Sequence, residues 1–310
     1  MPLQNILTLN NLVEKRDLEA LKQLVFPVYR NQNHTLTFRS ALMVSTHNVK
    51  HLMKIPTLNA ECLILNLEDG VSPEEKPYAL VLCALALASN PVIDKKIVVR
   101  VNALDEGGVE EIIYLNAFMP DAIRIPKIRS VEDVKRALEL IDEGIEVHLS
   151  IETKEAWLHL GELAISPRIK AYYLGILDLF ADLGLSQGLF TPDNPMTHYI
   201  LSHFLITTRA CGVKPVSFVY QEYKNSDGLR RWLELEKTMG FNAKGCISPS
   251  QVELIDETFD SSEFELARAC EIIRLFEEYA SRGITGFVDE RYGFIDEPIY
   301  KGALAVINNR

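Results

Sequence analysis

Two carboxylates, Glu152 and Asp178, stand near the ends of apolar runs, where they can do chemistry. Glu152 directly follows the apolar run at 147–151, and Asp178 directly follows the run at 171–177. The segment between the two runs has apolar residues at helical spacing, which predicts strand, helix, strand. In a parallel sheet both acids then lie at the carboxyl edge of neighbouring strands. Two carboxylates there favour a hard cation, Mg²⁺ or Mn²⁺, although either acid alone could instead cap a helix.

Charged residues also stand at three other strand ends. Glu68 and Asp69 follow the apolar run CLILNL, and Lys127 follows AIRIP. Arg100 lies inside the apolar run VVRVN, where its planar fork can hold a carboxylate with two hydrogen bonds. That carboxylate belongs either to a substrate or, in a purely structural ion pair, to Glu68 or Asp69. Together these residues predict a site for an anionic, oxygen-rich small molecule bound to a metal.

The elements that must position these residues alternate along the chain. Eight strand-like runs are separated by helical patterns, and neither a GxGxxG nor a GxxxxGK[ST] motif occurs. This alternation predicts an α/β fold, a (β/α)₈ TIM barrel, in which chemistry sits on the loops that follow the strands. The strand-like runs are 41–45, 62–67, 97–101, 122–126, 147–151, 172–176, 215–219 and 243–248.

Three segments are expected in the chain of 310 residues. Residues 1–37 have apolar residues at helical spacing and predict an N-terminal helical extension. Residues 38–281 are expected to form the barrel domain that holds the charged site. Residues 282–310, with turn signals and several aromatic residues, predict a C-terminal arm that acts as a lid or packs on a neighbouring subunit.

Composition narrows the class of protein. The formal net charge of −11 argues against a nucleic-acid partner, because phosphate contacts need clustered Lys and Arg. Five scattered cysteines without a CxxC pair are typical of reduced thiols in the cytosol. The longest apolar run, residues 79–88, is about half of a membrane span. We therefore expect a soluble cytoplasmic protein with no membrane partner.

Several motifs resemble, in order, those of the citrate lyase β-subunit-like (HpcH/HpaI aldolase) family. The motifs are Arg39-Ser40, LEDGV at 67–71, RVN at 100–102, PK at 126–127, IET at 151–153, DLFADLG at 178–184 and GFNAKGCISPSQ at 240–251. The stretch KIPTLNAECLILNLEDGV is especially similar to citramalyl-CoA lyase-type members. The resemblance implies a Mg²⁺-dependent TIM-barrel C–C lyase, often a trimer. Its substrates would be citramalyl-, malyl- or citryl-thioesters of CoA or acyl carrier protein, cleaved to a keto acid and an acetyl thioester or formed in reverse.

The resemblance also implies roles for individual residues. Glu152 and Asp178 would hold the metal, and Arg100 would stabilise the oxygen that changes from hydroxyl to carbonyl. Glu68 and Asp69 would orient metal-bound water and relay the hydroxyl proton. Substrate binding is expected from Arg39, Arg100 and Lys127.

The sequence departs from the family near the seventh strand. Ser217, Glu222 and Asn225 stand where the family has aspartates, one of which is an acid/base reached from a neighbouring subunit. Asn225 cannot transfer a proton, so Glu222 or Asp227 would have to substitute. Two alternatives therefore stay open: a metal-dependent aldolase on free keto acids such as pyruvate or oxaloacetate, and a non-catalytic metabolite-binding paralogue.

Overall fold

The computed structural model describes residues 6–28, 30, 32, 37–260 and 263–308. Parts of the expected N-terminal extension, residues 1–5, 29, 31 and 33–36, thus lie outside the described residues. Contacts divide the chain into two compact units, Met1–Thr258 and Phe259–Arg310. The expected segment boundaries at residues 37/38 and 281/282 stay a prediction.

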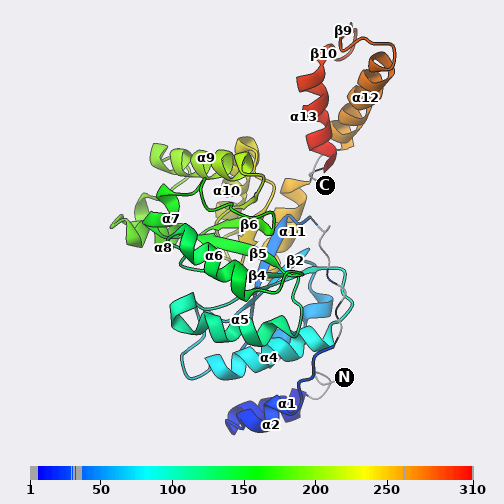
Figure 1. Ribbon diagram of the computed structural model, residues 1–310. Helices are drawn as coiled ribbons and strands as arrows, with labels where there is room; N and C mark the ends of the chain where they lie inside the picture. The colour runs from blue at the N-terminus through cyan, green and yellow to red at the C-terminus, as the bar shows by residue number, and fades with distance from the viewer. Residues whose placement is uncertain (1–5, 29, 31, 33–36, 261–262, 309–310) are drawn as a thin grey trace. The chain divides into compact units, whose positions relative to one another are not determined.

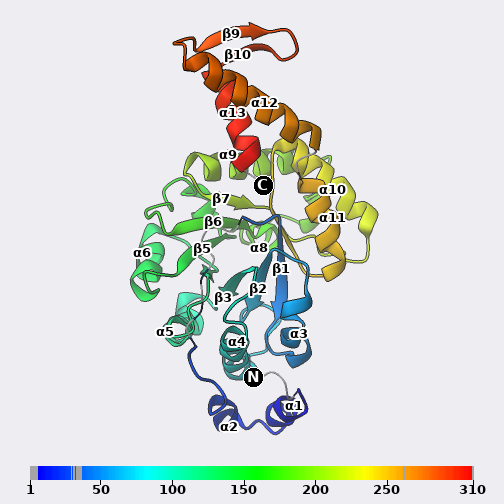
Figure 2. The same cartoon turned by 90° about the vertical axis from the view of Figure 1, so that its right-hand side faces the viewer.

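The first unit is built on eight parallel strands in the order β7-β6-β5-β4-β3-β2-β1-β8 (Figures 1 and 2). The ends of this sheet meet where Ser217 pairs with Lys244. There the Ser217 N–H donates to the Ala243 carbonyl (2.9 Å), and the Gly245 N–H donates to the Ser217 carbonyl (3.0 Å). The predicted (β/α)₈ barrel is confirmed. The strands are β1 (Ser40–Ser45), β2 (Cys62–Asn66), β3 (Lys96–Arg100), β4 (Ala122–Ile125), β5 (Glu146–Ile151), β6 (Ile169–Leu174), β7 (Lys214–Val216) and β8 (Lys244–Cys246).

Helices surround the strands, as Figure 2 shows most clearly. Local signals in the sequence fix several of their ends: Ser130 and Asp133 form a capping box at the start of α6, and Gly240 ends α10 with a φ of 101°. None of the described helices is long and apolar enough to cross a membrane. The helices are α3 (Val49–Met53), α4 (Lys76–Ser89), α5 (Val109–Asn116), α6 (Val131–Leu140), α7 (Lys154–Leu158), α8 (Ile176–Asp182), α9 (Pro195–Ala210), α10 (Ser226–Met239) and α11 (Pro249–Phe259).

Alternation along each strand separates the barrel interior from the helix-facing side. One part of the interior holds mostly small or apolar buried residues, among them Ala41, Ile64, Val98, Ala122 and Ala171. On β5, the side chains at positions 146, 148 and 150 are all buried and make polar contacts with residues of β3, β4 and β6. A polar column therefore runs through the barrel towards the carboxyl ends of the strands.

Two helices precede the barrel, α1 (Ile6–Glu14) and α2 (Leu18–Lys22). They contact each other, and they pack against α3 and α4 on the outside of the barrel (Figure 2). Leu9 and Leu21 are buried in this packing. These helices lie apart from the strand ends and contribute no side chain to the pocket described below.

The second unit consists of two helices and a hairpin: α12 (Glu263–Ala280), β9 (Gly286–Asp289), β10 (Gly293–Asp296) and α13 (Glu297–Asn308). It has its own small core around Ile272, Phe276 and Ile295. The Phe276 and Tyr300 rings stack at 4.5 Å between centroids. The expected roles of the C-terminal segment, as a lid or as an arm on another subunit, stay predictions.

Candidate active site

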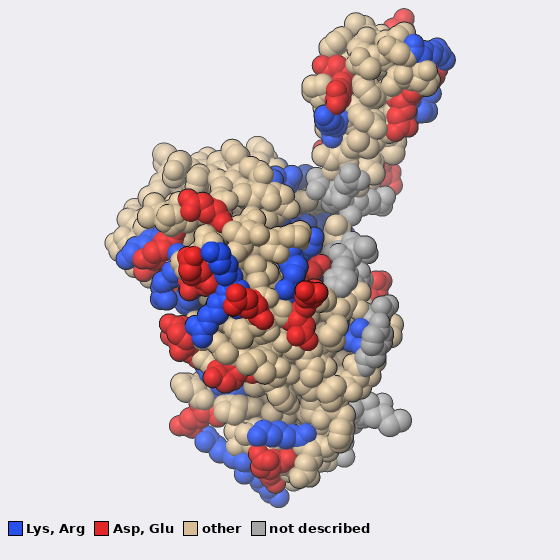
Figure 3. Space-filling view, viewed as in Figure 1, with Lys and Arg blue, Asp and Glu red and all other residues tan. Residues whose placement is uncertain are grey.

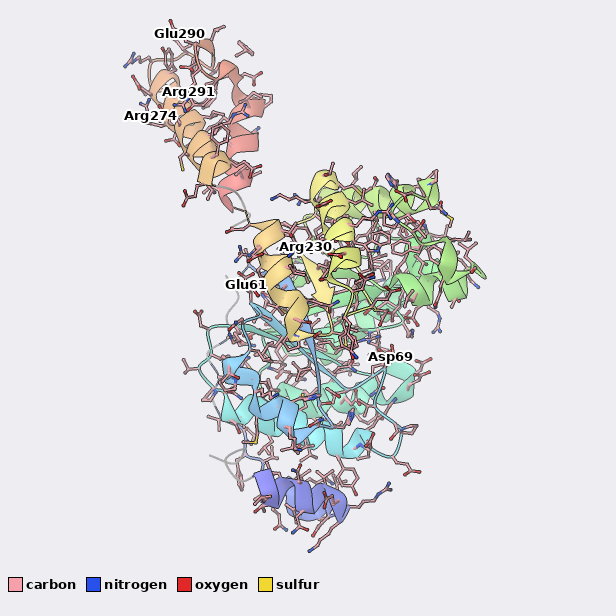
Figure 4. The ribbon with its side chains drawn as sticks, turned by 180° about the vertical axis from the view of Figure 1, so that it is seen from behind. Glu61, Asp69, Arg230, Arg274, Glu290 and Arg291 are labelled. Atoms are coloured by element: carbon pink, nitrogen blue, oxygen red, sulfur yellow. The ribbon has the colours of Figure 1, made fainter. Side chains whose placement is uncertain are left out.

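A pocket of about 290 Å³ opens at the carboxyl ends of the barrel strands. Its charged lining residues are Asp69, Arg100, Arg124, Glu152 and Asp178. Figure 4 shows Asp69 on the opposite side of the barrel unit from Glu61, as expected for residues that follow and precede the same strand, β2. In barrels of this type the carboxyl end is the usual place for catalysis. Most of the charged residues that the sequence predicted for the site thus lie at the expected end of the barrel.

Glu152 and Asp178 converge on one cation, the ammonium of Lys127. Lys127 Nζ lies 2.6 Å from Asp178 Oδ1 and 3.7 Å from Glu152 Oε1. Oxygens of both carboxylates therefore reach the same small volume, which fits a divalent metal. Within the described ranges no group of three or more His, Cys, Asp or Glu is arranged to hold a metal. A metal here would draw its other ligands from water and substrate, as Mg²⁺ commonly does.

Glu152 is held tightly in place, with only 2% of its surface exposed. Its Oε1 accepts a hydrogen bond of 2.8 Å from the backbone N–H of Lys127. Lys127 has a φ of 53°, which is uncommon for a residue with a side chain and is typical of functional sites. On the other side, a Cβ at Gly175 would lie 2.6 Å from Glu152 Oε2, so only glycine fits there. The backbone around Glu152 is thus shaped to present its carboxylate.

Arg100 is surrounded by carboxylates. Its Nη2 pairs with Glu68, lies 3.0 Å from Asp69 Oδ2 and is 3.9 Å from Glu152 Oε2. Burial, helped by the negative charges of Glu152 and Asp69, raises the pKa of Glu68 to about 7, although the positive charge of Arg100 lowers it. Arg100 thus forms the structural ion pair and also lines the pocket, and its role towards a substrate stays a prediction.

Arg39 lies away from the other predicted site residues. It precedes β1, so it is at the amino end of the barrel, opposite the pocket. Its Nη2 lies 2.5 Å from Glu61 Oε1, and its backbone N–H donates to Glu61 Oε2 at 2.6 Å. The structure does not bring Arg39 together with Arg100 or Lys127.

The residues that depart from the family pattern do not point into the pocket. Ser217 is buried and donates to Glu236 Oε1 at 2.5 Å. Asn225 caps α10, where its Oδ1 accepts from the Gly228 N–H (2.9 Å) and its Nδ2 donates to Glu222 Oε2 (2.8 Å).

On this side the pocket is lined by uncharged residues, Val219, Gln221 and Ile247. Lys244, whose Nζ is 2.6 Å from Glu236 Oε1, is fully buried with its partner and belongs to the packing of the barrel. The side of the pocket that carries Glu152 and Asp178 is therefore charged, and the side near β7 and β8 is not.

Arg124, which was not among the residues expected at the site, lines the pocket beside Arg100. Arg124 is only 6% exposed, and its Nε donates to Ser150 Oγ at 2.8 Å. The signal was available, because Arg124 interrupts the apolar strand AIRIP just as Arg100 interrupts VVRVN. Gln221, in contrast, lies in a loop with no pattern that marks it.

Comparisons with known proteins identify relatives over most of the chain. A sequence model described as HpcH/HpaI aldolase/citrate lyase matches residues 39–249. A (3S)-malyl-CoA thioesterase of Cereibacter sphaeroides is 33% identical over 247 residues, covering 79% of this chain and 85% of that protein. The mitochondrial citramalyl-CoA lyase of Rattus norvegicus is 27% identical over 290 residues, covering 87% of this chain and 85% of that protein.

The fold also matches solved structures. The CitE protein of Mycobacterium tuberculosis, in complex with magnesium, acetoacetate and coenzyme A, superposes with a TM-score of 0.69 at 24% identity. The match covers 89% of this chain and 99% of that one. At this identity the similarity supports the fold.

Proposed function

The chain belongs to the HpcH/HpaI aldolase/citrate lyase family, and from this premise we propose that it is a Mg²⁺-dependent C–C lyase. Its substrates would be 3-hydroxy-carboxyalkyl thioesters, such as citramalyl-, malyl- or citryl-CoA or the corresponding acyl carrier protein thioesters. Cleavage gives a keto acid and an acetyl thioester, and the reverse reaction is a condensation. The observation that supports this proposal most is the convergence of Glu152 and Asp178 on one cation beside Arg100.

Glu152 and Asp178 would hold Mg²⁺, or Mn²⁺. When bound, such an ion supplies a Lewis acid that polarises substrate oxygens and anchors the carboxylate of the keto-acid half. Lys127 Nζ occupies the space between the two carboxylates, so a metal held there would take its place and leave the ammonium to pair with an anionic substrate.

Cleavage removes the proton from the C3 hydroxyl, breaks the C2–C3 bond, turns the hydroxyl oxygen into a carbonyl and leaves C2 in need of a proton. Arg100 is suited to donate hydrogen bonds to that oxygen, because Glu68 and Asp69 fix its guanidinium at the edge of the pocket. Asp69 lines the pocket and is mostly exposed, so it is the better placed of the two acids to take the hydroxyl proton. Glu68 acts as a positioning residue for Arg100.

The residues that line the uncharged side of the pocket include no acid that could protonate C2, so the proton must come from another residue. Glu222 and Asp227 are the acids nearest in sequence to that side, and a neighbouring subunit is another source.

We propose a homotrimer in the cytoplasm, in line with the family resemblance and with the five free cysteines. The mass of the assembly in solution, measured by light scattering, tests the trimer.

The decisive screen supplies Mg²⁺ and measures release of keto acid and acetyl-CoA from malyl-, citramalyl- and citryl-CoA. We expect release from at least one of them, abolished by EDTA and restored by Mg²⁺. No release of keto acid from any of the three thioesters, with a folded protein and Mg²⁺ present, would contradict the proposal.

Thioester hydrolysis is a second candidate, because the relative that is 33% identical is named a (3S)-malyl-CoA thioesterase. The uncharged side of the pocket favours it as well, since a weak supply of protons to C2 slows C–C cleavage. The same screen separates the two reactions: hydrolysis of malyl-CoA gives malate and free CoA, whereas cleavage gives glyoxylate and acetyl-CoA. The relatives' names favour thioester substrates over free keto acids, and an enzyme over a non-catalytic binding protein.

A further inference from the structure

Two arginines that line the pocket lie side by side. Arg100 on β3 and Arg124 on β4 are register partners, so their backbones are about 4.8 Å apart across the sheet. Both are almost completely buried, and both line the pocket. Two adjacent buried cations repel each other unless anions compensate them.

The positive charges of the two arginines are compensated to different extents by neighbouring carboxylates. Arg100 has Glu68 and Asp69 as ion-pair partners. Arg124, in contrast, forms no ion pair with any described residue, and the one hydrogen bond that its side chain makes to them runs from Nε to Ser150 Oγ (2.8 Å). Its two terminal nitrogens, the tips of the guanidinium fork, find no acceptor among the residues that the structure describes.

The guanidinium of Arg124 is nevertheless held in a fixed position. Its Cζ lies 4.2 Å from the centroid of the Tyr173 ring, and the Ser150 contact fixes Nε. Burial, and next the neighbouring Arg100, lower the pKa of Arg124 to about 10, so it remains a cation at neutral pH. A rigid, buried cation with a free fork is a binding site for a planar anion, and a carboxylate matches it with two parallel hydrogen bonds.

We propose that Arg124 binds a second carboxylate of the substrate, in the substituent on C3, so that the preferred keto-acid product is a dicarboxylate rather than a monocarboxylate. This inference rests on the proposed function, because it assumes that the keto-acid half occupies this pocket. Glu152 and Asp178 would then hold the metal that binds one end of the keto acid, and Arg124 would bind the carboxylate at its other end. A merely structural Arg124, stacked on Tyr173, would show no preference between the two classes of acid.

The test compares two keto acids that differ by one carboxylate, oxaloacetate and pyruvate. Each is titrated, freshly prepared, into the full-length protein with Mg²⁺, and binding is measured by calorimetry. We expect wild type to bind oxaloacetate at least tenfold more tightly than pyruvate. In Arg124→Met this preference should disappear, while pyruvate affinity changes by no more than about threefold. Equal affinity in wild type, or an equal loss for both acids in the variant, would overturn the proposal.

Two milder variants keep the test informative if Arg124→Met does not fold. Arg124→Lys retains the charge without the fork and should keep only part of the preference. Ser150→Ala removes the hydrogen bond that fixes Nε and should weaken oxaloacetate binding more than pyruvate binding. If both variants keep the full preference, Arg124 does not select the acid.

Failure of the role of Arg124 and failure of the lyase proposal would give different experimental results. A preference that depends on Arg124, found in a protein that cleaves none of the three thioesters, would support the binding role and contradict the lyase. Cleavage of citramalyl-CoA at ordinary rates, together with equal binding of both keto acids, would support the lyase and overturn the role of Arg124.

Discussion

The two ends of the barrel interior both bury charged residues, yet they differ in how those charges are compensated. At the amino end, Lys96 Nζ lies 2.7 Å from Glu146 Oε2, and both side chains are buried. At the carboxyl end of the same strand β3, Arg100 pairs with the carboxylates of Glu68 and Asp69 and lines a pocket. Lys96 and Arg100 are only four residues apart in the sequence, but one contributes to a closed pair and the other to an open site.

The pKa values of two buried carboxylates express the same difference. Burial alone would raise the pKa of Glu146, but His148 and Lys96 outweigh it and hold the pKa at about 2. Burial raises the pKa of Glu68 to about 7, because Arg100 only partly offsets it and Glu152 lies nearby. A buried charge is therefore no sign of function by itself, whereas a buried charge that the protein leaves incompletely compensated beside a pocket is one.

The amino end should matter for stability and not for chemistry. Lys96→Met removes the ammonium that pairs with the buried Glu146 and should lower the free energy of unfolding by about 3–5 kcal/mol. We expect kcat/KM of the folded variant to stay within about twofold of wild type. Urea unfolding and steady-state assays measure the two effects, and a large loss of activity in a folded variant would remove the distinction between the ends.

At the carboxyl end the outcome should be reversed. Arg100→Lys should lower turnover by about a hundredfold to a thousandfold, because a point charge cannot replace the bidentate fork at the reacting oxygen. The matched control is Arg39→Lys, the same substitution in the ion pair with Glu61 at the amino end, and it should leave turnover nearly unchanged. Normal turnover in Arg100→Lys would show that Arg100 is only a structural partner of Glu68.

A smaller effect is expected on the uncharged side of the pocket. Asn225→Asp would place two carboxylates together, since Asn225 Nδ2 now lies 2.8 Å from Glu222 Oε2. Repulsion between the two carboxylates would raise the pKa of one of them, which favours its protonated form as a proton donor. We expect thioester cleavage to rise by up to about tenfold, with Mg²⁺ affinity unchanged and the α10 cap preserved, because Asp caps helices as well as Asn.

Two acid variants complete that test. Glu222→Gln and Asp227→Asn should each lower cleavage if the residue already supplies the proton. If wild type cleaves at ordinary enzyme rates and none of the three substitutions changes the rate, the donor lies elsewhere, for example on a neighbouring subunit.

The smallest effect concerns pH. Because the folded protein raises the pKa of Glu68 from 4.5 to about 7, the folded state binds this proton more tightly, and stability falls as pH rises between those values. Without added metal, Glu68→Gln should flatten the decline of the melting temperature between pH 5 and 7.5. Glu146 acts in the opposite sense, since its contribution is present above 4.5 and is lost as pH falls towards 2. Identical profiles for wild type and Glu68→Gln would contradict the raised pKa.

Much of the barrel could be predicted because each strand carries a local signal. Every predicted run overlaps one observed strand, since buried strands of a parallel sheet are continuous apolar runs bounded by turn residues. Glu152, Asp178 and Lys127 could be placed together for the same reason, because they follow strands whose carboxyl ends share one edge.

Other features depend on three-dimensional contacts that no local pattern encodes. Arg39 resembles a site residue by its motif, but its position before β1 puts it at the other end of the barrel. The contrast between Arg100 and Arg124 lies in their partners, Glu68 and Asp69 for one and Ser150 for the other, and these come from different strands. Ser217 looked like a replaced catalytic residue, although its hydroxyl is bonded to the buried Glu236.

The central claim, that Glu152 and Asp178 form a metal site, is tested most directly by the effect of Mg²⁺ on thermal stability. A ligand that binds only the folded state at a hundred times its Kd stabilises by about 2.7 kcal/mol, so the melting temperature of wild type should rise by several degrees. The variant carrying both Glu152→Gln and Asp178→Asn should show no rise. Asp182→Asn, on the same helix as Asp178 but bonded to the Lys154 N–H, should behave like wild type. An equal rise in wild type and in the double variant would remove both residues from the metal site.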